Sequence, residues 1–315
     1  MDILKVSFII PTYNAEKYLE QCLKSIFNQD YPSDRIEVFI VDGGSEDKTL
    51  EIAAKFNVNV LKNPRRIAEY GKFIAFKQSS GVVIALLDSD NVIASKDWLK
   101  RMMYPISQDP KILGSESNYL IAKDFTSINT YLNLLIIADP LARMIASRPK
   151  LIKSGRFNLK KYNIGDVPVS GANGFLWRRE KIEQYLEGHD TFEEGNLLSR
   201  IAKSEKVYIA NIPGLGIYHY YCISLKDYVN KRKKIASKFL GRKKKKIQTW
   251  VDSVNNFWFF ISIIYLSTLL GPMIESLFNF VRSGRREWFW HPIVCLITVT
   301  VYLRSFLNYY ARKFF

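Results

Sequence analysis

Cysteine is scarce in this sequence, and two common nucleotide-binding motifs are missing from it. The 315 residues include three cysteines and three histidines. Cys22, Cys222 and Cys295 lie far apart, with neither disulfide nor metal-ligand spacing, which fits a reduced cytosolic compartment and assigns them no role. The patterns GxGxxG and GxxxxGK[ST] are both absent, so neither a dinucleotide fold with its usual motif nor a P-loop is supported. Because no secretory signal pattern opens the chain, we expect its amino-terminal part to stay in the cytosol.

Acidic residues are outnumbered by basic ones, but the excess is not spread evenly. Lys and Arg number 46 against 30 Asp and Glu, a net charge of +16. Eleven basic residues and one acid lie between Lys226 and Trp250. A uniformly basic surface would favour nucleic acid, whereas a basic block directly before a long apolar run indicates an anionic membrane surface. We therefore expect a membrane partner and no nucleic acid, with 226–250 as a basic juxtamembrane segment.

Two long apolar runs follow the basic block, at 257–281 and 288–310. Each is long enough to cross a bilayer, for which about 20 residues suffice. The basic block favours a hairpin with both ends in the cytosol. The sequence thus predicts that 251–315 forms a transmembrane helical hairpin and that the protein is multi-pass, with its amino-terminal domain facing the cytoplasm. Glu275 and the Gly271-Pro272 pair weaken the first span, and the alternative is two buried or interfacial helices.

A third apolar run, 131–145, is too short to span a membrane and is interrupted by Asp139-Pro140. We expect it to be a core helix or a helix that lies at the membrane interface. No internal repeat and no second low-complexity segment interrupts the rest of the chain, and the 48% hydrophobic content predicts a folded protein.

The first 115 or so residues alternate between β-rich runs and helical periodicity. The β-rich runs are 5–11, 36–42, 58–62 and 82–88. Each is apolar on both faces, which is typical of a parallel sheet covered by helices. Between the first two runs, 14–27 has the spacing of an amphipathic helix with Asn14 as a plausible N-cap. The sequence therefore predicts an α/β fold with a mostly parallel, Rossmann-like sheet and flanking helices.

Polar residues cluster directly after three of these runs, as PTYN, DGGSED and DSDN. Ligands of such sheets bind at the carboxyl ends of the strands. Asp88 and Asp90 have no Lys or Arg nearby in the sequence, so a divalent cation, Mg²⁺ or Mn²⁺, would neutralise them. Such an ion would also bind a diphosphate and stabilise its charge as it leaves. The alternative is a turn with an Asp that caps the helix expected over 95–104.

In their order and spacing, VSFIIPTYN, IEVFIVDGGSEDKT and GVVIALLDSDN resemble the family 2 glycosyltransferases, which have the GT-A fold. The resemblance covers residues 5 to about 225 and defines a GT-A domain at 1–225. It implies a nucleotide-sugar site formed by residues of these motifs. Pro11, Thr12 and Tyr13 would pack against the base, Asp42 would hydrogen-bond it, Lys72 would lie near the phosphates, and Asp88, Ser89 and Asp90 would hold the nucleotide sugar. Asp88, Asp90 and His219 would bind the metal, although a lone His among tyrosines is also typical of a packed side chain. The sequence has Gly43 where many relatives have a second acid.

The acceptor half of the family pattern is also represented. Gly171, Ala172, Asn173 and Gly174 resemble the small-residue segment that lines the acceptor and sugar pocket. Glu193 and Glu194 resemble the family's acidic pair, whose second member is the general base of an inverting transfer. Glu194 replaces the usual Asp, and its alternative role is an acidic helix amino terminus. A lipid phosphate acceptor would need no base at all.

The resemblance implies a membrane-anchored, metal-dependent, inverting glycosyltransferase of the hexosyltransferase type. We expect a UDP-sugar as donor, with a GDP-sugar as the other possibility, and a hydroxyl of a lipid-linked or cell-envelope glycan as acceptor. One alternative is a polyprenyl phosphate glycosyl synthase. A second is a nonenzymatic binding protein that is recruited to membranes and retains the fold. A processive synthase is disfavoured because no QxxRW-like stretch follows the acidic pair.

Overall fold

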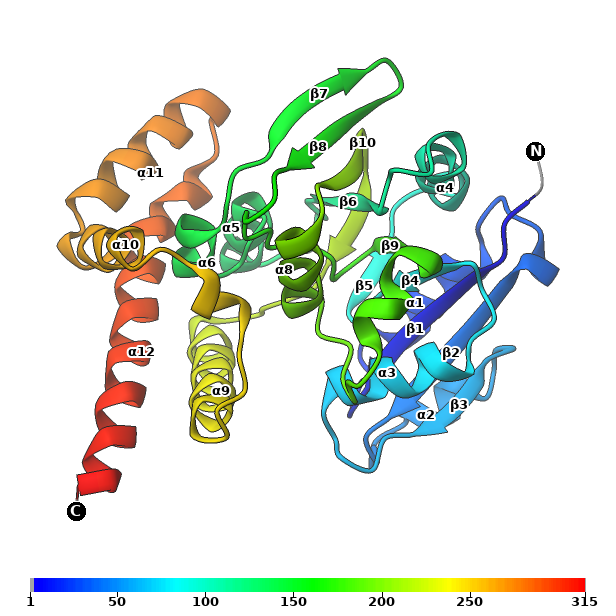
Figure 1. Ribbon diagram of the computed structural model, residues 1–315, viewed down its shortest axis with the longest axis horizontal. Helices are drawn as coiled ribbons and strands as arrows, with labels where there is room; N and C mark the ends of the chain where they lie inside the picture. The colour runs from blue at the N-terminus through cyan, green and yellow to red at the C-terminus, as the bar shows by residue number, and fades with distance from the viewer. Residues whose placement is uncertain (1–2, 315) are drawn as a thin grey trace. The chain divides into compact units, whose positions relative to one another are not determined.

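The computed structural model describes residues 3–314, and these form two compact units (Figure 1). The first unit contains the chain up to residue 120 together with 147–219. The second contains 121–146 together with the chain from residue 220 onward. The segment 121–146, which the sequence analysis placed inside its first domain, therefore groups with the carboxyl-terminal helices.

The first unit is built on one mixed sheet. Within the described residues the sheet has ten strands, in the order β3-β2-β1-β4-β9-β6-β10-β8-β7, with β5 paired to β10. Their bounds are β1 Val6–Thr12, β2 Ile36–Asp42, β3 Asn59–Lys62, β4 Val83–Leu86, β5 Asn91–Ile93, β6 Gly114–Leu120, β7 Lys150–Ser154, β8 Phe157–Tyr162, β9 Phe175–Arg178 and β10 Val207–His219. The four predicted strands are β1 to β4, and they pair in parallel as expected. β3 departs from the prediction, because it lies at the edge of the sheet and Val60 is 50% exposed.

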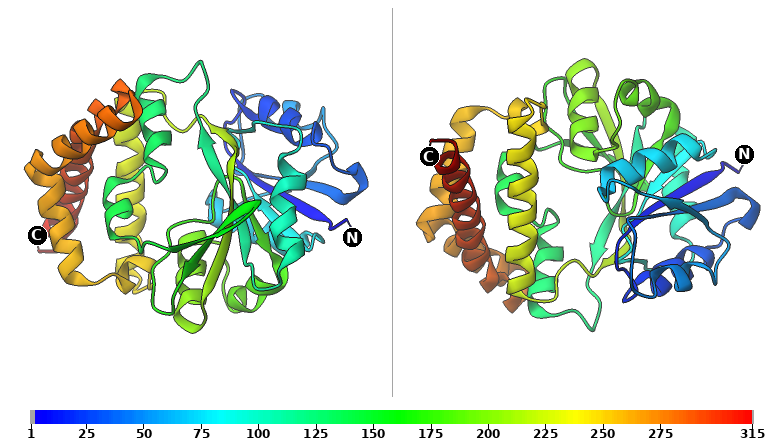
Figure 2. Two further views of the ribbon diagram at one scale, coloured as in Figure 1. Left: turned by 90° about the horizontal axis from the view of Figure 1, so that it is seen from above. Right: turned by 90° about the horizontal axis from the view of Figure 1, so that it is seen from below.

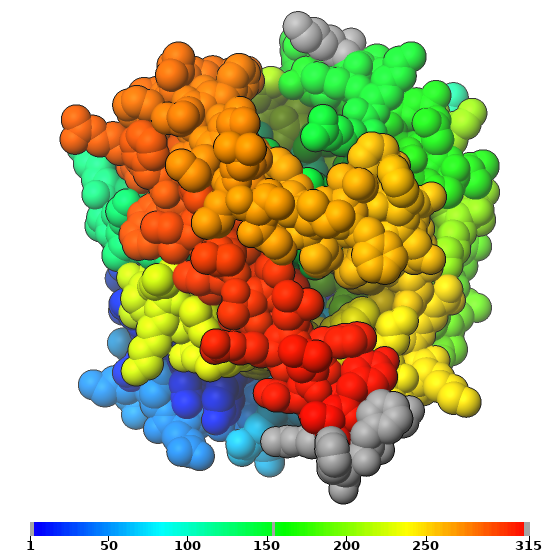
Figure 3. Space-filling view, turned by 90° about the vertical axis from the view of Figure 1, so that its left-hand side faces the viewer, coloured from blue at the N-terminus to red at the C-terminus, as the bar shows by residue number. Residues whose placement is uncertain are grey.

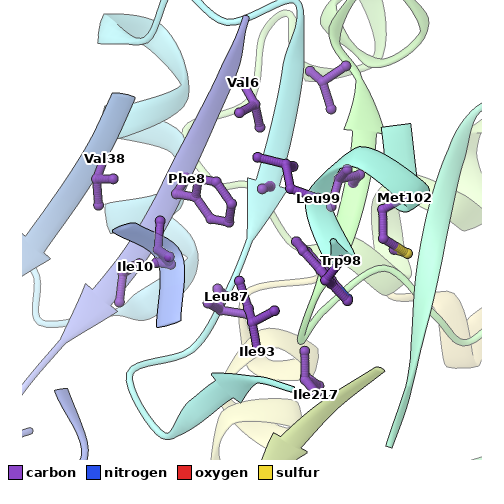
Figure 4. Close-up of a cluster of buried hydrophobic side chains, with 14 of the residues drawn as sticks. Val6, Phe8, Ile10, Val38, Leu87, Ile93, Trp98, Leu99, Met102 and Ile217 are labelled. Carbon is purple, nitrogen blue, oxygen red and sulfur yellow. The ribbon is translucent and has the colours of Figure 1, made fainter. Parts of the chain in front are cut away.

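Helices cover both faces of this sheet. They are α1 Leu19–Phe27, α2 Thr49–Ala53, α3 Ala68–Gln78, α4 Trp98–Gln108, α7 Arg179–Ile182 and α8 Glu194–Ser204. Because side chains alternate along a strand, Phe8 and Ile10 pack with α1, α2 and α4, whereas Ile9 packs with α3 and α8 on the other face. Figure 4 shows part of the first layer, with Phe8 and Ile10 of β1 and Trp98 of α4. Each fully buried side chain of this size contributes about 1.5–3 kcal/mol. The two apolar layers fix the sheet and, with it, the ends of its strands.

The predicted N-cap at Asn14 is wrong. Helix α1 begins at Leu19, and Asn14 has a left-handed backbone with φ of 49°. Its Oδ1 instead accepts a hydrogen bond from the Glu46 amide (3.0 Å), and its own amide donates to Ser45 Oγ (2.9 Å). Asparagine tolerates this backbone conformation better than most residues. Asn14 therefore joins the loop after β1 to the loop after β2.

The second unit is helical (Figure 2). Its helices are α5 Ser127–Leu135, α6 Pro140–Ile145, α9 Leu225–Lys244, α10 Asn256–Thr268, α11 Leu270–Ser283 and α12 Trp290–Phe314. The apolar run 131–145, expected as one helix, is divided between α5 and α6. Asp139 is the N-cap of α6, where its Oδ1 accepts from the amides of Leu141 (2.9 Å) and Ala142 (3.1 Å). Both helices, α5 and α6, pack in the core of this unit.

The predicted transmembrane hairpin is present only in part. Among the described residues, one straight helical segment, Arg286–Ala311, is long and apolar enough to cross a membrane, and it contains most of α12. The other predicted span is broken into α10 and α11, which are bent by 77°. Leu269, at the break, has a φ of 60°, and Pro272 lies in the first turn of α11, where its missing N–H costs no helical hydrogen bond. The structure therefore has one straight candidate span and one broken helix pair in place of two straight spans.

Candidate active site

Asp42 builds the loop that follows β2. It is 5% exposed, and its Oδ2 accepts hydrogen bonds from the amides of Gly44 and Ser45, each at 2.8 Å. Its Oδ1 accepts from Ser45 Oγ (2.5 Å) and from Thr12 Oγ1 (3.1 Å). A carboxylate has about four acceptor positions, so the loop itself satisfies this one. A hydrogen bond that a nucleotide base would donate to Asp42 stays a prediction.

Arg66 lies beside the loop that contains Gly43, the residue that stands where many relatives have a second acid. Tyr13, predicted to pack on a base, is 53% exposed, and the Arg66 guanidinium lies 5.7 Å from the centroid of its ring. A Cβ placed on Gly44, next to Gly43, would be 3.4 Å from Arg66 Nη2. Pro11 lies two residues before Tyr13, in β1, and pairs with Val41 of β2. The sequence analysis missed Arg66, although the basic pair that follows β3 could have drawn attention to it.

Asp88, Ser89 and Asp90 lie in a turn between β4 and β5, and not in the strand itself. The alternation of side chains along a strand therefore does not align the two carboxylates. Asn91, which is fully buried, holds the turn instead. Its Nδ2 donates to Asp90 Oδ1 (3.0 Å), while its Oδ1 accepts from the Asp88 amide (3.2 Å). The side chains of Asp88 and Asp90 remain 39% and 26% exposed, so both can reach a ligand.

Strand pairing brings His219 to this turn. The last residue of β10 pairs with Asn91 of β5, and the His219 Nε2 lies 3.6 Å from Asp90 Oδ1. The His219 ring also lies 5.4 Å from the ring of Tyr119, a residue of β6 that the sequence analysis missed. Burial raises the pKa of the Tyr119 phenol, so it stays a neutral hydrogen-bonding group. No local sequence signal identifies Tyr119, because only the β6–β10 pairing places it here.

Lys72 lies between two of the predicted functional acids. It is 5% exposed on α3, and its Nζ forms an ion pair with Glu194 Oε1 and lies 3.8 Å from Asp88 Oδ1. Burial alone would lower the pKa of Lys72, but the carboxylates of Glu194 and Asp88 outweigh it and raise the pKa. Lys72 is therefore a buried, permanently charged cation, in the region where the sequence predicted a phosphate-binding residue.

The acidic pair divides into two different environments. Glu194 is the first residue of α8 and is 9% exposed. Burial raises its pKa, and the opposing effect of Lys72 is smaller. Glu193 is the N-cap of the same helix, and its Oε2 accepts a hydrogen bond from Asn196 Nδ2 (2.7 Å). Glu194 is thus the acid that contacts Lys72, whereas Glu193 bonds within its own helix.

The small-residue segment packs directly on this acid. A Cβ on Gly171 would lie 2.4 Å from Trp177 Cζ2 and 3.2 Å from Glu194 Cβ, and its φ is 102°. Trp177 Nε1 donates to the Gly171 carbonyl (2.9 Å). The Gly174 amide donates to the carbonyl of Leu86 at the end of β4 (2.8 Å). The segment is therefore fixed between Glu194 and the strand that leads to Asp88.

Ala172 and Asn173 lie between these two anchors and are half-buried. Asn173 has a strained backbone, with φ of 29°, and its buried Oδ1 has no hydrogen-bond partner among the described residues. Strained, unsatisfied polar groups are concentrated at functional sites. The predicted acceptor segment is thus next to the predicted base in space, although about 20 residues separate them in the chain.

A metal would need ligands from outside the protein here. Across residues 3–314, no group of three or more His, Cys, Asp or Glu side chains is arranged to hold a metal ion. Asp88 and Asp90 offer carboxylate oxygens, and His219 offers an imidazole nitrogen beside Asp90. Mg²⁺ commonly binds through one or two carboxylates together with substrate phosphates and water. The donor set therefore fits an ion that shares its coordination with a bound diphosphate.

Comparison with protein families gives one match, and it covers more than half of the chain. Residues 7–186 match the model of glycosyl transferase family 2. This range contains β1 to β9 and every predicted nucleotide-sugar residue, but not Glu193, Glu194 or His219.

Curated relatives are similar over shorter segments. Glycosyltransferase AglE of Haloferax volcanii is 37% identical over 108 residues, which is 32% of this chain and 35% of that protein. A dolichyl N-acetyl-alpha-D-glucosaminyl phosphate 3-beta-D-2,3-diacetamido-2,3-dideoxy-beta-D-glucuronosyltransferase of Methanococcus voltae is 29% identical over 148 residues, 44% of this chain and 45% of that protein. The chain thus spans less than half the length of these two relatives.

Solved structures share the fold over nearly the whole chain. The mannosyltransferase PcManGT from Pyrobaculum calidifontis, solved in complex with GDP-Man and Mn²⁺, superposes with a TM-score of 0.60 and 15% sequence identity, and the match covers 96% of this chain and 88% of that one. At this identity the likeness shows the GT-A type of fold alone. The family match, which covers more than half of the chain, establishes that the chain belongs to glycosyltransferase family 2.

Proposed function

We propose that this glycosyltransferase moves a sugar from a nucleoside diphosphate to a hydroxyl of a lipid-linked or cell-envelope glycan. One observation carries the proposal: Asp88, Lys72 and Glu194 form a continuous series of charged contacts at the carboxyl end of β4. The series combines an acid exposed to ligand, a buried cation and a buried acid next to the acceptor segment. These are the groups needed for a diphosphate leaving group and for an acceptor proton.

In the proposed reaction the bond between the anomeric carbon and the diphosphate breaks while a bond to the acceptor oxygen forms. Glu194 accepts the proton of the acceptor hydroxyl. Gly171 to Gly174 hold the acceptor against Glu194, so that attack comes from the side opposite the diphosphate and inverts the anomeric centre. Asp88, Asp90 and His219 would hold a Mn²⁺ or Mg²⁺ ion, which would stabilise the negative charge of the departing diphosphate.

Calorimetric titration of the detergent-purified full chain tests the donor site. UDP and GDP are titrated separately, with and without Mn²⁺. We expect one nucleotide to bind in the presence of the metal and Asp90→Asn to weaken that binding. Asp34→Asn is the matched control, because the side chain of Asp34 is 76% exposed outside the site. Absence of binding by both nucleotides, or equal binding by Asp90→Asn, would contradict the proposed donor site.

The contact of Glu194 with Lys72 also favours a second acceptor class. A carboxylate engaged by a buried cation is a structural group as readily as a base, and a polyprenyl phosphate acceptor would need no base. Transfer to a phosphate would survive Glu194→Gln with little loss of rate. The rate of transfer to a hydroxyl would fall by about 10²–10⁴-fold, which is the usual contribution of general base catalysis. Comparing the two acceptor classes in this variant decides between them.

A membrane location for the enzyme is supported by α11, whose polar side chains face the protein interior and whose apolar side chains face outward. On α11 the polar groups face inward: Glu275 pairs with Arg143 (2.7 Å) and accepts from Tyr265 OH (2.8 Å). The outward face is apolar, with Met273, Ile274, Leu277, Phe278 and Val281 each more than half exposed. Figure 3 shows α10 and α11 in orange and α12 in red on one face of the second unit. Exposed apolar patches of this kind mark membrane contacts, and the internal ion pair removes the objection that Glu275 raised to membrane burial.

We therefore propose that the second unit is embedded in a membrane, with α12 crossing it and the α9 lysines on the anionic cytoplasmic surface. Alkaline carbonate treatment of membranes should leave the full chain in the pellet, and its release would refute the proposal. An Arg285→Cys variant, at an exposed position just after α11, reports on the broken pair. Labelling by an impermeant maleimide from outside intact cells would mean that α10 and α11 together cross the membrane, as the multi-pass prediction requires.

A further inference from the structure

The ion pair between Lys72 and Glu194 presents a chemical conflict. Both side chains are at least 89% buried, and the pair is direct. The buried cation stabilises the charged form of the carboxylate and so makes Glu194 a weaker proton acceptor. The same cation is then unavailable to an incoming diphosphate. Although burial still raises the pKa of Glu194, the ion pair limits each partner in its proposed role.

Lys72 has a second anionic neighbour on its other side. Its Nζ lies 3.8 Å from Asp88 Oδ1, and the Asp88 side chain is 39% exposed, toward the place proposed for the diphosphate. Lysine carries a compact charge and three donors on a flexible four-carbon stem. A small rotation of that stem moves the ammonium from Glu194 toward Asp88 without any displacement of α3. The side chain therefore lies between two alternative partners.

We propose that Lys72 changes partners when the donor binds, leaving Glu194 for the diphosphate and so releasing Glu194 to act as base. This inference rests on the proposed function. In the unoccupied site, Lys72 holds Glu194 in an ion pair. A diphosphate at Asp88 and Asp90 offers the ammonium more negative charge than one carboxylate does. Lys72 is thus a positioning residue that couples the donor site to the base, and acceptor activation follows donor binding.

The coupling has a measurable signature in the donor site alone. If Glu194 competes with the diphosphate for Lys72, part of the binding free energy is spent on breaking the ion pair. Glu194→Gln removes the competing charge at nearly constant shape. Nucleotide binding should therefore become tighter, by about tenfold, in the very variant that loses transfer to a hydroxyl. A base that only contacts the acceptor would leave nucleotide affinity unchanged.

The experiment titrates UDP and GDP with Mn²⁺ into the wild-type protein, Glu194→Gln, Lys72→Met and the double variant. The affinity gain of Glu194→Gln should vanish in the Lys72→Met background, because the gain acts through the ammonium. If the gain persists there, it reflects only the loss of a negative charge near the phosphates, and the partner exchange is refuted. Glu180→Gln, whose side chain is 70% exposed, is the matched control and should match the wild-type protein.

Glu194→Asp gives an answer even if Lys72→Met fails to fold. It keeps the charge but shortens the side chain by one methylene, which weakens the contact with Lys72. We expect a smaller gain in nucleotide affinity in the same direction, of about threefold. Unchanged or weaker binding by Glu194→Asp would overturn the inference while leaving the donor site intact. Failure of the wild-type protein to bind either nucleotide would overturn the proposed function and this inference together.

Discussion

Replacing Gly171 by alanine should damage both stability and transfer, and the structure separates two causes. The first is the backbone: φ is +102°, a conformation that costs an L-residue about 1–2 kcal/mol. The second is contact, because the new Cβ would lie 2.4 Å from Trp177 Cζ2. The Trp177 ring is fully buried and tied to the Gly171 carbonyl, so it has little room to move. Overpacking of this kind lowers the stability by a further amount of about 1–3 kcal/mol.

Gly188→Ala isolates the contact term. Gly188 also has a positive φ, of 71°, but a Cβ there meets no atom within 4 Å. Both variants therefore place an alanine at a positive φ, and only Gly171→Ala also suffers the close contact. For a domain of this size, about 2 kcal/mol corresponds to a melting temperature roughly 4–8 °C lower. Thermal unfolding of both variants in the same detergent measures this difference.

The result also bears on catalysis. A shift of about 1 Å in the segment beside Glu194 can cost about 10²-fold in rate. We therefore expect Gly171→Ala to reduce transfer strongly while Gly188→Ala retains it. If Gly171→Ala melts at the same temperature as Gly188→Ala, the segment is not held as tightly as its contacts indicate, and the assignment of 171–174 as a rigid acceptor wall is wrong.

Three further predictions concern the metal, the turn and the helical unit. Removing divalent cations with EDTA should abolish the nucleotide binding seen by calorimetry, and added Mn²⁺ should restore it; binding that survives EDTA would exclude the shared metal. Asn91→Ala should weaken nucleotide binding by about tenfold, since each hydrogen bond to a charged group contributes about 1.5–3 kcal/mol and the turn loses its bond to Asp90. Arg232→Met should destabilise the second unit by about 3–5 kcal/mol, because it leaves the Asp139 carboxylate without its buried partner at 2.7 Å. Lys233→Met, at an exposed neighbouring position, should change the melting temperature little, and equal effects of the two would contradict the role of the buried pair.

Local patterns were sufficient for the parallel half of the sheet. The runs that became β1, β2 and β4 are apolar at consecutive positions, and this pattern requires burial on both faces. The remaining strands could not be predicted in the same way. β10, for example, contains two glycines and a proline, and its place in the sheet depends on partners from three other strands.

The candidate site divides along the same line. Asp88, Lys72 and Glu194 could be named from motifs in the sequence, but their contact with one another could not, because 122 residues separate Lys72 from Glu194. Tyr119 carries no motif and becomes visible only when strand pairing places it. Arg66 has the basic pair after β3 as a sequence signal, but its position beside Tyr13 depends on loop geometry. Gly271-Pro272 weakened the first predicted span, but the break at Leu269 was not predicted. The inward orientation of Glu275 depends on Arg143 and therefore on tertiary packing.

The division of the chain into units limits how a soluble form of this enzyme can be made. The chain leaves the first unit after residue 120, returns at 147, and leaves again after 219. Truncation near residue 225 would remove α9 to α12 but keep α5 and α6. The buried side chains of Ile128, Tyr131 and Leu132 would then lose the helices that cover them. A truncated protein would therefore aggregate unless the 121–146 excursion were also replaced by a short polar linker.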